Sequence, residues 1–519
     1  MKRMNIWKGV RVCLALLFFI PIALFFVDFT GTLPDQLHVL LHAQVMPALL
    51  GGFWAIILLH LALTLLVGRL YCSTVCPAGV LQDIINRIYC IGKTKKKGAR
   101  RFAYHKPMNA LRYVLLALTA LSALAGVMNL YLLLDPYSHF GRIATNLLRP
   151  LVMLTNNGAA HLLMEMDNYT LYQVTVSTVT RAGFVSGLIA LLLFVGLSVW
   201  RGRLFCNTLC PVGSLLSLFS RYALFRPAID AESCVHCGLC EQACKAEAID
   251  SKGIKIDTSR CVDCFNCILA CHTGSIQFRF APLKKKAEQV NEEAKPDASR
   301  RTFLATSGIL AGTLPAIAQG RRTRKRLRQG QDPTHWPPVT PPGSLSLERF
   351  KDLCTGCHVC VTQCPSQVLR PAGLQYGFDY LLKPYMSYEN SYCNYECTVC
   401  ADVCPAHALK PLTKEEKTTT QIGVAHFFIE RCIVYTEGND CGACSEHCPT
   451  QAVRMVPYQG TLTIPEVNPD LCVGCGGCES ICPVRPVRAI LIKPNEVHKR
   501  VEKPKEEEVK DIEVTDFGF

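Results

Sequence analysis

Cysteine spacing constrains this chain more than any other feature. Twenty-four of its 30 cysteines fall into six groups of four, and every group ends in the spacing C-x2-C-x3-C. A chain of 519 residues can bury a core without disulfides, which belong mostly to short secreted domains. Thiolates at this spacing hold [4Fe-4S] clusters, so the sequence predicts six such clusters.

The first two groups carry the regular run C-x2-C-x2-C-x3-C. In ferredoxins with two clusters, three thiolates of each run hold one cluster and the fourth reaches the other. One cluster is therefore predicted to bind Cys234, Cys237, Cys240 and Cys271, and the other Cys261, Cys264, Cys267 and Cys244.

Four more groups follow after a break, each with proline directly after its last cysteine. Their predicted cluster ligands are Cys354, Cys357, Cys360, Cys364, Cys393, Cys397, Cys400, Cys404, Cys432, Cys441, Cys444, Cys448, Cys472, Cys475, Cys478 and Cys482. The middle two groups open with longer spacings, as expected where loops have grown. Zinc is the alternative, because two C-x2-C pairs can form a tetrahedral site. Six groups with one shared ending favour iron and sulfur over zinc.

A shorter cysteine pattern occurs twice nearer the N-terminus. Residues 68–79 read GRLYCSTVCPAG and residues 202–213 read GRLFCNTLCPVG. Because C-x3-C puts both sulfurs on one helical face, the four thiols of Cys72, Cys76, Cys206 and Cys210 form a candidate metal or redox site. It would hold one further iron–sulfur cluster or soft metal; the alternative is two buried pairs of free thiols. Cys13 and Cys90 are left over as ordinary thiols.

Long apolar runs occupy the first 200 residues. Half of the residues are hydrophobic, mean hydropathy is +0.20 and the net charge is +14. Four runs, at 12–29, 49–67, 111–134 and 182–200, approach the ~20 residues that span a bilayer, so we expect four transmembrane helices. The segment 93–112 is basic and has no acidic residue, which places it and the N-terminus in the cytoplasm.

The predicted architecture is an α-helical membrane bundle joined to α+β ferredoxin-like domains. We expect a membrane domain at 1–222, a two-cluster ferredoxin domain at 223–283, a charged linker at 284–298, a four-cluster ferredoxin-like domain at 331–493 and a charged tail at 494–519.

The segment 299–330 resembles an export signal. It begins with Ser299-Arg300-Arg301-Thr302-Phe303-Leu304 and continues with an uncharged stretch to Ala318. Paired arginines, a short apolar region and an A-x-A ending are the parts of a twin-arginine signal, read by the twin-arginine export machinery. We therefore expect the four-cluster domain to be periplasmic, although the basic cluster at 321–328 favours the cytoplasm. The sequence leaves open whether the segment is a signal, cleaved after Ala318, or an anchor.

These motifs together resemble two known families. Residues up to about 280 resemble NapH, the membrane quinol-dehydrogenase subunit associated with periplasmic nitrate reductase, and residues from about 299 onward resemble the NapG and MauM ferredoxins. The chain looks like a natural fusion of the two. This resemblance implies a bacterial inner-membrane protein that oxidises quinol from the quinone pool and passes electrons to a periplasmic reductase or cytochrome.

The resemblance also implies a ligand pairing in the C-terminal domain. The two outer cysteine groups would exchange their fourth cysteines with each other, and so would the two inner groups. Cys354, Cys357 and Cys360 would then pair with Cys482, and Cys472, Cys475 and Cys478 with Cys364. Cys393, Cys397 and Cys400 would pair with Cys448, and Cys432, Cys441 and Cys444 with Cys404.

A quinol site needs protonatable groups near a membrane surface, and Asp135, Tyr137 and His139 directly follow the third apolar run. Packing at a helix end is the alternative for each of them. Two other functions also fit the sequence: an iron–sulfur scaffold or maturation reductase for another metalloenzyme, and cytoplasmic transfer from ferredoxin to quinone. The sequence has no nucleotide-binding motif, and its low aromatic content of 8% disfavours nucleic acid as a partner.

Overall fold

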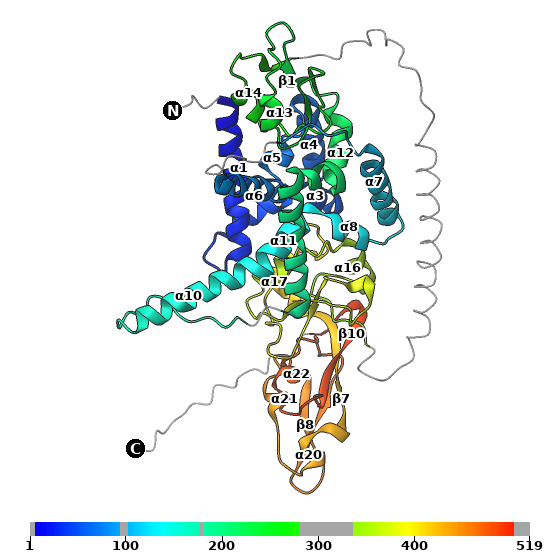
Figure 1. Cartoon of the computed structure of the whole chain (residues 1–519). Helices are drawn as coiled ribbons and strands as arrows, with labels where there is room; N and C mark the ends of the chain where they lie inside the picture. Colours follow the sequence, from blue (N-terminus) through cyan, green and yellow to red (C-terminus); the bar gives the residue numbers. More distant parts are fainter. Residues whose placement is uncertain (1–5, 94–101, 177–179, 281–335, 503–519) are drawn as a thin grey trace. The chain divides into compact units, whose positions relative to one another are not determined.

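The computed structural model describes residues 6–93, 102–176, 180–280 and 336–502. The described residues up to 280 and from 338 onward belong to one compact unit. The predicted linker, the twin-arginine-like segment and the end of the charged tail lie outside the described residues. The elements of this unit are labelled in Figure 1.

The N-terminal part of this unit is helical. Its elements are α1 (Ile6–Val27), η1 (Asp35–His38), α2 (Val39–His42), α3 (Val45–Gly51), α4 (Trp54–Val67), α5 (Tyr71–Thr74), α6 (Pro77–Lys93), α7 (Asn109–Leu124), α8 (Asn129–Leu134), α9 (Pro136–Ile143), η2 (Ala144–Leu148), α10 (Arg149–Met164), α11 (Arg181–Arg201), η3 (Phe205–Leu209) and α12 (Pro211–Ser220).

Within the described ranges two of the four predicted transmembrane helices, α1 and α11, are long and apolar enough to cross a membrane. The run 49–67 is divided because Gly52 ends α3 with a φ of +76°, and Gly126, with a φ of +72°, separates α7 from α8. Glycine adopts this left-handed conformation readily and often ends helices. α4 and α7 keep 14 and 16 residues, or about 21 to 24 Å, short of the ~30 Å hydrocarbon core of a bilayer.

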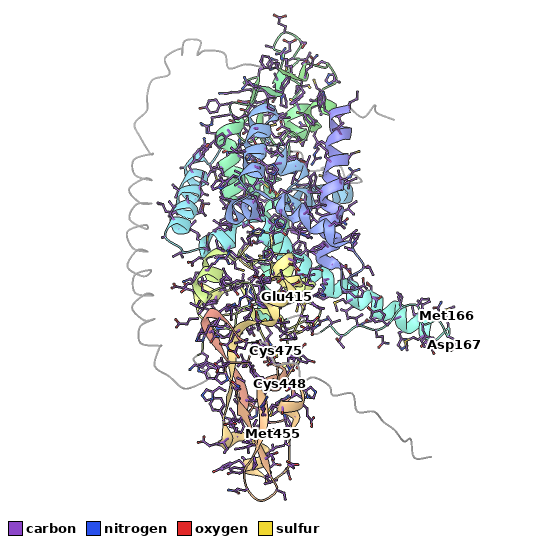
Figure 2. All side chains as sticks on the ribbon, turned by 180° about the vertical axis from the view of Figure 1, so that it is seen from behind. Met166, Asp167, Glu415, Cys448, Met455 and Cys475 are labelled. Atoms are coloured by element: carbon purple, nitrogen blue, oxygen red, sulfur yellow. The ribbon has the colours of Figure 1, made fainter. Side chains whose placement is uncertain are left out.

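The outer faces of the helical part are apolar. Leu17 on α1, Leu58 on α4 and Leu192 on α11 are each more than 60% exposed. α10 projects sideways from the other helices, with Met166 and Asp167 at its far end (Figures 1 and 2). Exposed apolar surface of this extent marks a surface that contacts lipid or another protein.

A small ferredoxin-like domain follows α12. Strand β1 (Phe225–Ile229) pairs antiparallel with β4 (Ile276–Phe280), and β2 (Ile249–Asp250) pairs with β3 (Lys255–Ile256). The short helices α13 (Leu239–Ala243) and α14 (Asn266–Ala270) pack against each other, and each ends directly before the last cysteine of its run. This arrangement brings the two cysteine runs of the domain together.

The C-terminal part holds the four remaining cysteine groups. Its elements are α16 (Leu347–Leu353), α17 (Val359–Gln363), β5 (Leu369–Pro371), η6 (Phe378–Tyr380), β6 (Pro384–Met386), α18 (Val399–Asp402), α19 (Lys414–Thr418), β7 (Thr420–Phe427), η7 (Ile429–Arg431), α20 (Ile433–Thr436), α21 (Ala443–Glu446), β8 (Val453–Pro457), β9 (Thr463–Val467), α22 (Gly477–Ile481) and β10 (Ile490–Arg500). Three antiparallel pairs, β5–β6, β7–β10 and β8–β9, frame a core that contains many of the cysteines.

Helix α1 contacts the two-cluster domain at its first turn and the C-terminal part at its last. The ring of Trp7 lies 5.2 Å from that of Phe278, measured between centroids. At the other end, Gln363 Nε2 donates a hydrogen bond of 2.6 Å to the carbonyl oxygen of Phe25. A helix of 22 residues is about 33 Å long, so these contacts lie at opposite ends of a membrane-length helix.

Helix α11 contacts the same two domains, but its first turn lies at the C-terminal part and its last turn at the two-cluster domain. A Cβ atom at Gly183, in its first turn, would lie 3.1 Å from Cγ of Pro371 in the C-terminal part. Just after its last turn, the Arg203 N–H donates a hydrogen bond of 3.0 Å to the carbonyl oxygen of Lys245 in the two-cluster domain. Both apolar helices therefore separate the same two cysteine-rich domains.

Candidate iron–sulfur sites

Several cavities in the structure are each lined by four cysteines, the number of ligands that one [4Fe-4S] cluster needs. A cavity of about 360 Å³ in the two-cluster domain is lined by Cys261, Cys264, Cys267 and Cys244. This is the grouping that the motif predicts, and we name it site two. Site one is the companion group, Cys234, Cys237, Cys240 and Cys271, in which Cys237 is exposed.

Three further cavities of this kind, of about 300 to 370 Å³, lie in the C-terminal part. Site three is lined by Cys354, Cys357, Cys360 and Cys404, and site four by Cys393, Cys397, Cys400 and Cys364. Site six is lined by Cys432, Cys441, Cys444 and Cys482. Cys432 thus joins its group despite the long loop that separates it from Cys441.

Site five consists of Cys472, Cys475, Cys478 and Cys448. Burial raises the pKa values of the first three thiols, and the charge of Cys448 adds to the shift in each. Cys448 and Cys475 are labelled close together in Figure 2. All four fourth cysteines therefore pair with the neighbouring group along the chain.

The pairing taken from the family resemblance is therefore wrong. It matched outer groups with each other and inner groups with each other, so that Cys354 would share a site with Cys482. The structure instead places Cys404 in the cavity with Cys354 and Cys482 in the cavity with Cys432. The physical reason is local: two consecutive groups fold as one unit and exchange their fourth cysteines, as sites one and two do.

The chemistry of these cavities fits [4Fe-4S] clusters. Their linings combine thiols with apolar side chains, and backbone N–H groups point at several sulfurs, as from Ala248 to Cys244 Sγ at 3.4 Å and from Leu409 to Cys404 Sγ at 3.4 Å. Hydrogen bonds to sulfur are among the features that set cluster potentials. Burial raises the pKa of Cys354 to about 12, so ligand binding must displace its proton.

The same cavities do not fit zinc. Four thiolates on one zinc ion, each about 2.3 Å from the metal, would lie within about 4 Å of one another. Among the residues that the structure describes, no group of three or more His, Cys, Asp or Glu side chains could hold a single metal ion. A cube takes one thiolate at each of four iron atoms, and each of these cavities supplies four cysteines.

The two C-x3-C-P segments meet inside the helical part. Cys72, Cys76, Cys206 and Cys210 are at most 4% exposed, and we name them the bundle cysteines. Cys76 interacts electrostatically with Cys206 and Cys72, and Cys210 with Cys206 and Cys76. In each segment the proline after the second cysteine begins a helix, α6 or α12, so the second cysteine lies at that helix's N-terminus.

Two arginines, not among the residues predicted from the sequence, hold this pair of segments together. Arg203 donates from Nη1 to the carbonyl oxygen of Cys72 at 2.6 Å, and Arg69 donates from Nη1 to that of Gly213 at 3.1 Å. Both guanidiniums are fully buried. Each belongs to the repeated Gly-Arg-Leu that precedes the cysteines, which was the signal available in the sequence. Their positive charge favours thiolates or an anionic cluster at the bundle cysteines.

On one side the bundle cysteines adjoin site two. Arg69 Nε donates to the carbonyl oxygen of Cys261 at 3.2 Å, and a Cβ atom at Gly68 would lie 2.5 Å from Oδ2 of Asp263. Asp263 also interacts electrostatically with Cys72. Lys245, which follows the site-two ligand Cys244, forms an ion pair with Asp83 in α6. Site two is thus the nearer of the two N-terminal sites to the bundle cysteines.

On the other side the helical part adjoins site three. A Cβ atom at Gly141 would lie 2.2 Å from the carbonyl oxygen of Cys357, and Arg142 Nε donates to the carbonyl oxygen of Gly356 at 3.3 Å. Asn146 Nδ2 lies 3.1 Å from Nδ1 of His358. From there the Cys393 N–H donates to the carbonyl oxygen of Cys475 at 3.0 Å, which joins sites four and five.

The candidate quinol residues lie between the bundle cysteines and site three. Asp135 is fully buried; its carboxylate accepts hydrogen bonds from Tyr131 Oη at 2.5 Å and from the Ser138 N–H at 2.7 Å, and it caps the N-terminus of α9. Both of its oxygens are thus used structurally. Tyr137 Oη and His139 Nδ1 are buried and have no hydrogen-bond partner within the described residues.

Comparison with known families assigns iron–sulfur domains to these regions. A model described as a 4Fe-4S binding domain matches residues 48–98 and 184–231, which contain the bundle cysteines. Models described as 4Fe-4S dicluster domains match residues 226–272, and residues 353–408 and 439–485. The last two ranges divide the C-terminal part into two consecutive units, as the cavities do, although the second range omits Cys432 of site six.

Curated relatives include several ferredoxin-type proteins. An uncharacterized protein of Methanocaldococcus jannaschii is 24% identical over 188 residues, or 36% of this chain and 55% of that protein. The ferredoxin-type protein NapG of Escherichia coli is 28% identical over 194 residues, 36% of this chain and 81% of NapG. The methylamine utilization ferredoxin-type protein MauM of Methylobacillus flagellatus is 32% identical over 147 residues, 26% of this chain and 60% of MauM.

No solved structure matches this chain. The matched domains, the NapG and MauM relatives and the cysteine-lined cavities agree on the chemistry of the chain. It is an iron–sulfur electron-transfer protein with several [4Fe-4S] ferredoxin domains.

Proposed function

We propose that this chain conducts electrons across a membrane between its two-cluster domain and its four-cluster domain. The observation that carries the proposal is the pair of contacts at opposite ends of α1 and of α11, the two apolar helices of membrane length. A protein that only stored or delivered clusters would have no need to hold two cysteine-rich domains at the two ends of the same helices.

The order of the sites supports this proposal. Contacts run from site two through Arg69 to the bundle cysteines, and from the helical part through Gly141 to site three. We infer six [4Fe-4S] clusters in sites one to six and a seventh iron–sulfur centre at the bundle cysteines. Each centre, when bound, accepts and donates one electron. The protein holds the centres in a fixed spatial order, buries their ligands and surrounds the bundle cysteines with positive charge.

The orientation follows from charge. The basic segment 93–112 favours a cytoplasmic two-cluster domain, and we infer that the four-cluster domain lies in the periplasm of a bacterial inner membrane. The twin-arginine-like residues before the four-cluster domain support the same arrangement. Helix α10 exposes Leu151, Leu154 and Leu162 on a segment that projects sideways, as a helix in the membrane surface would. In this arrangement residues up to about 280 act as a NapH-type subunit and the rest as a NapG-type partner.

Quinol is the proposed electron donor, and a periplasmic reductase or cytochrome the acceptor. Oxidation of quinol releases two electrons and two protons, so the electrons must enter one-electron sites and the protons must leave one at a time through a basic group. His139 Nδ1 can accept a proton because its Nε2 is held by the carbonyl oxygen of Leu133, and Tyr137 Oη can hydrogen-bond a quinol oxygen. We assign the quinol contact to these two residues, with each proton passed on to solvent. Asp135 supports them as the N-cap of α9.

The test is anaerobic reduction of the clusters by quinol in the full-length holoprotein, followed by visible absorbance. We expect Tyr137→Phe and His139→Gln to slow quinol-dependent reduction at least tenfold and to leave reduction by dithionite unchanged. Tyr172→Phe, at an exposed tyrosine after α10, is the matched control. If both variants are reduced by quinol at the wild-type rate, quinol does not react at these residues.

A further inference from the structure

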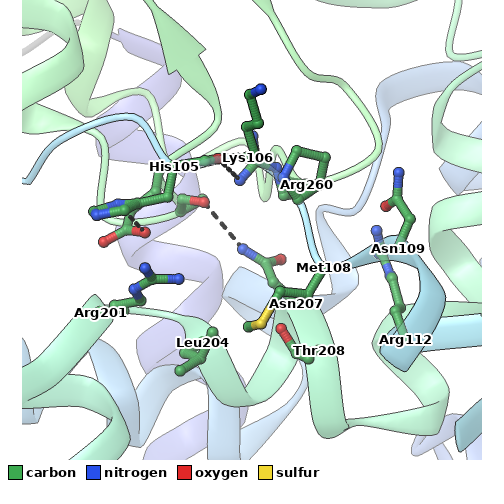
Figure 3. Close-up of a pocket in the computed structure, with 13 residues that line it drawn as sticks. His105, Lys106, Met108, Asn109, Arg112, Arg201, Leu204, Asn207, Thr208 and Arg260 are labelled. Atoms are coloured by element: carbon green, nitrogen blue, oxygen red, sulfur yellow. Dashed lines mark hydrogen bonds and ion pairs between the residues drawn. The ribbon is translucent and has the colours of Figure 1, made fainter. Parts of the chain in front are cut away.

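A pocket outside the cysteine-lined cavities lies where helices α7 and α11 meet the two-cluster domain. The space between its lining residues, which opens to solvent, is about 370 Å³. Figure 3 shows His105 and Arg201 on one side of it and Asn109 and Arg112 on the other. None of the proposed cluster ligands lines it, and the electron path described above does not use it.

Two buried arginines that line this pocket have donors without partners. Arg112 is 1% exposed, and its Nη2 donates to the carbonyl oxygens of Gly213 and Ser259, whereas its Nε and Nη1 find no acceptor within the described residues. Arg260 is 5% exposed. Its Nε pairs with Asp257 and its Nη1 donates to the carbonyl oxygen of His105, but its Nη2 has no acceptor within the described residues. Buried charged donors are costly when unpaired, so these three donors favour an acceptor bound beside them.

Other groups around the pocket favour an anion. Lys106 and Arg201 add positive charge, and the only lining carboxylate among the described residues, Glu247, already pairs with His105 at 2.9 Å. Helix α7 begins at Asn109, and its N-cap residue Met108 supplies no side-chain cap. The free N–H groups at the start of this 16-residue helix therefore face the same space, and helix N-termini favour negative charge.

We propose that this pocket binds a phosphate group. Arginine guanidiniums and helix N-termini are the groups that recognise phosphate most often, because both present several N–H donors to one anion. The phosphate can come from the headgroup of an anionic phospholipid or from a soluble phosphate ester. The exposed apolar faces of α7 and α11 beside the pocket favour the lipid, whose chains would lie along Leu121 or Leu192.

Binding has a structural consequence. The pocket is built from the N-terminus of α7, the C-terminal end of α11 and the loop that carries Arg260, next to the site-two ligand Cys261. A phosphate bound by Arg112 and Arg260 would therefore join the two-cluster domain to the helical part at the basic side of the membrane. Anionic lipids are concentrated at the cytoplasmic leaflet, where basic residues attract them.

The test uses the delipidated full-length holoprotein in a neutral detergent. Native mass spectrometry measures binding of phosphatidylglycerol and phosphatidylcholine, and a thermal-shift titration measures glycerol phosphate. We expect phosphatidylglycerol to bind the wild type at least tenfold more tightly than Arg112→Gln or Arg201→Gln. Arg221→Gln is the matched control, because this exposed arginine contacts Tyr113 and does not line the pocket.

The lipid measurement and the glycerol phosphate measurement distinguish the two possible sources of phosphate. Binding of phosphatidylglycerol that depends on Arg112 supports a lipid site, and binding of glycerol phosphate with the same dependence and no lipid effect supports a soluble ester. If Arg112→Gln loses iron, its lipid binding no longer tests the pocket. The comparison then rests on Arg201→Gln, because Arg201 is only partly buried. Failure of both probes to bind the wild type, or equal binding by Arg112→Gln, Arg201→Gln and Arg221→Gln, overturns the proposal.

Discussion

Arg203 donates a hydrogen bond of 2.6 Å from Nη1 to the carbonyl oxygen of Cys72, 131 residues away in the chain. Its Nε also donates to Oδ1 of Asp83 at 2.8 Å. One fully buried guanidinium thus ties the second C-x3-C-P segment to the first, and to the acidic residue that also pairs with Arg11 and Lys245. This link holds the bundle cysteines in one group.

Replacement of Arg203 is therefore expected to be severe. Arg203→Leu removes one partner of a buried ion pair and leaves Asp83 with less compensation, which lowers the free energy of unfolding by on the order of 3 kcal/mol. Thermal unfolding in detergent measures this loss. Arg221→Leu, at an exposed position, should change stability by less than about 0.5 kcal/mol. Equal effects of the two substitutions would show that the buried link is not structural.

The ligand pairing can be tested by double substitution. If Cys354 and Cys404 share site three, the iron lost by Cys354→Ala and Cys404→Ala together equals the loss in either single variant. The loss in Cys354→Ala with Cys482→Ala should instead be the sum of the two single losses, because the sites are separate. Iron analysis of purified protein distinguishes the two patterns. Additive losses for Cys354 and Cys404 would instead favour the pairing that the resemblance implies, in which the outer groups share ligands with each other and the inner groups with each other.

The contact between α9 and site three gives a third prediction. A Cβ atom at Gly141 would lie 2.2 Å from the carbonyl oxygen of Cys357, so Gly141→Ala must displace one of the two backbones. We expect a loss of about 1–3 kcal/mol in stability and faster hydrogen exchange around residues 354–363. Gly158→Ala on α10 is the control, since nothing lies within 4 Å of its Cβ position. That substitution should leave stability unchanged or raise it by up to about 1 kcal/mol.

Some of this architecture could be predicted from the sequence. The apolar runs 12–29 and 182–200 predict α1 and α11, and α1 continues through Pro21. The runs 49–67 and 111–134 were too long as predicted, because Gly52 and Gly126 take positive φ and end helices there. The two glycines were visible in the sequence, but glycine within an apolar run does not by itself predict a break.

The cysteine sites could likewise be predicted from the sequence only in part. Spacing predicts that Cys244 joins Cys261, because the fourth cysteine of a run reaches the neighbouring cluster. The same rule applied to the C-terminal groups would have paired Cys404 with Cys354. Contacts such as that between Arg142 and Gly356, 214 residues apart, leave no local pattern, so the sequence could not predict which site adjoins the helices.

The bundle cysteines give a fourth prediction. Cys76→Ala with Cys210→Ala should remove the iron of one centre and leave sites one to six filled, because the six sites have their own ligands. Cys13→Ala with Cys90→Ala is the control pair, at cysteines outside every group, and should leave the iron content unchanged. If the iron content of Cys76→Ala with Cys210→Ala equals that of the wild type, the bundle cysteines are free thiols.

The most direct test of electron transfer across the membrane uses sealed proteoliposomes. Dithionite added outside reaches the outward domain of each molecule, whichever way it is inserted. The account predicts that wild-type clusters bleach as completely as after detergent is added. Cys76→Ala with Cys210→Ala should bleach only in part until detergent opens the vesicles. Partial bleaching of the wild type, or full bleaching of this variant before detergent, would contradict a continuous path through the bundle cysteines.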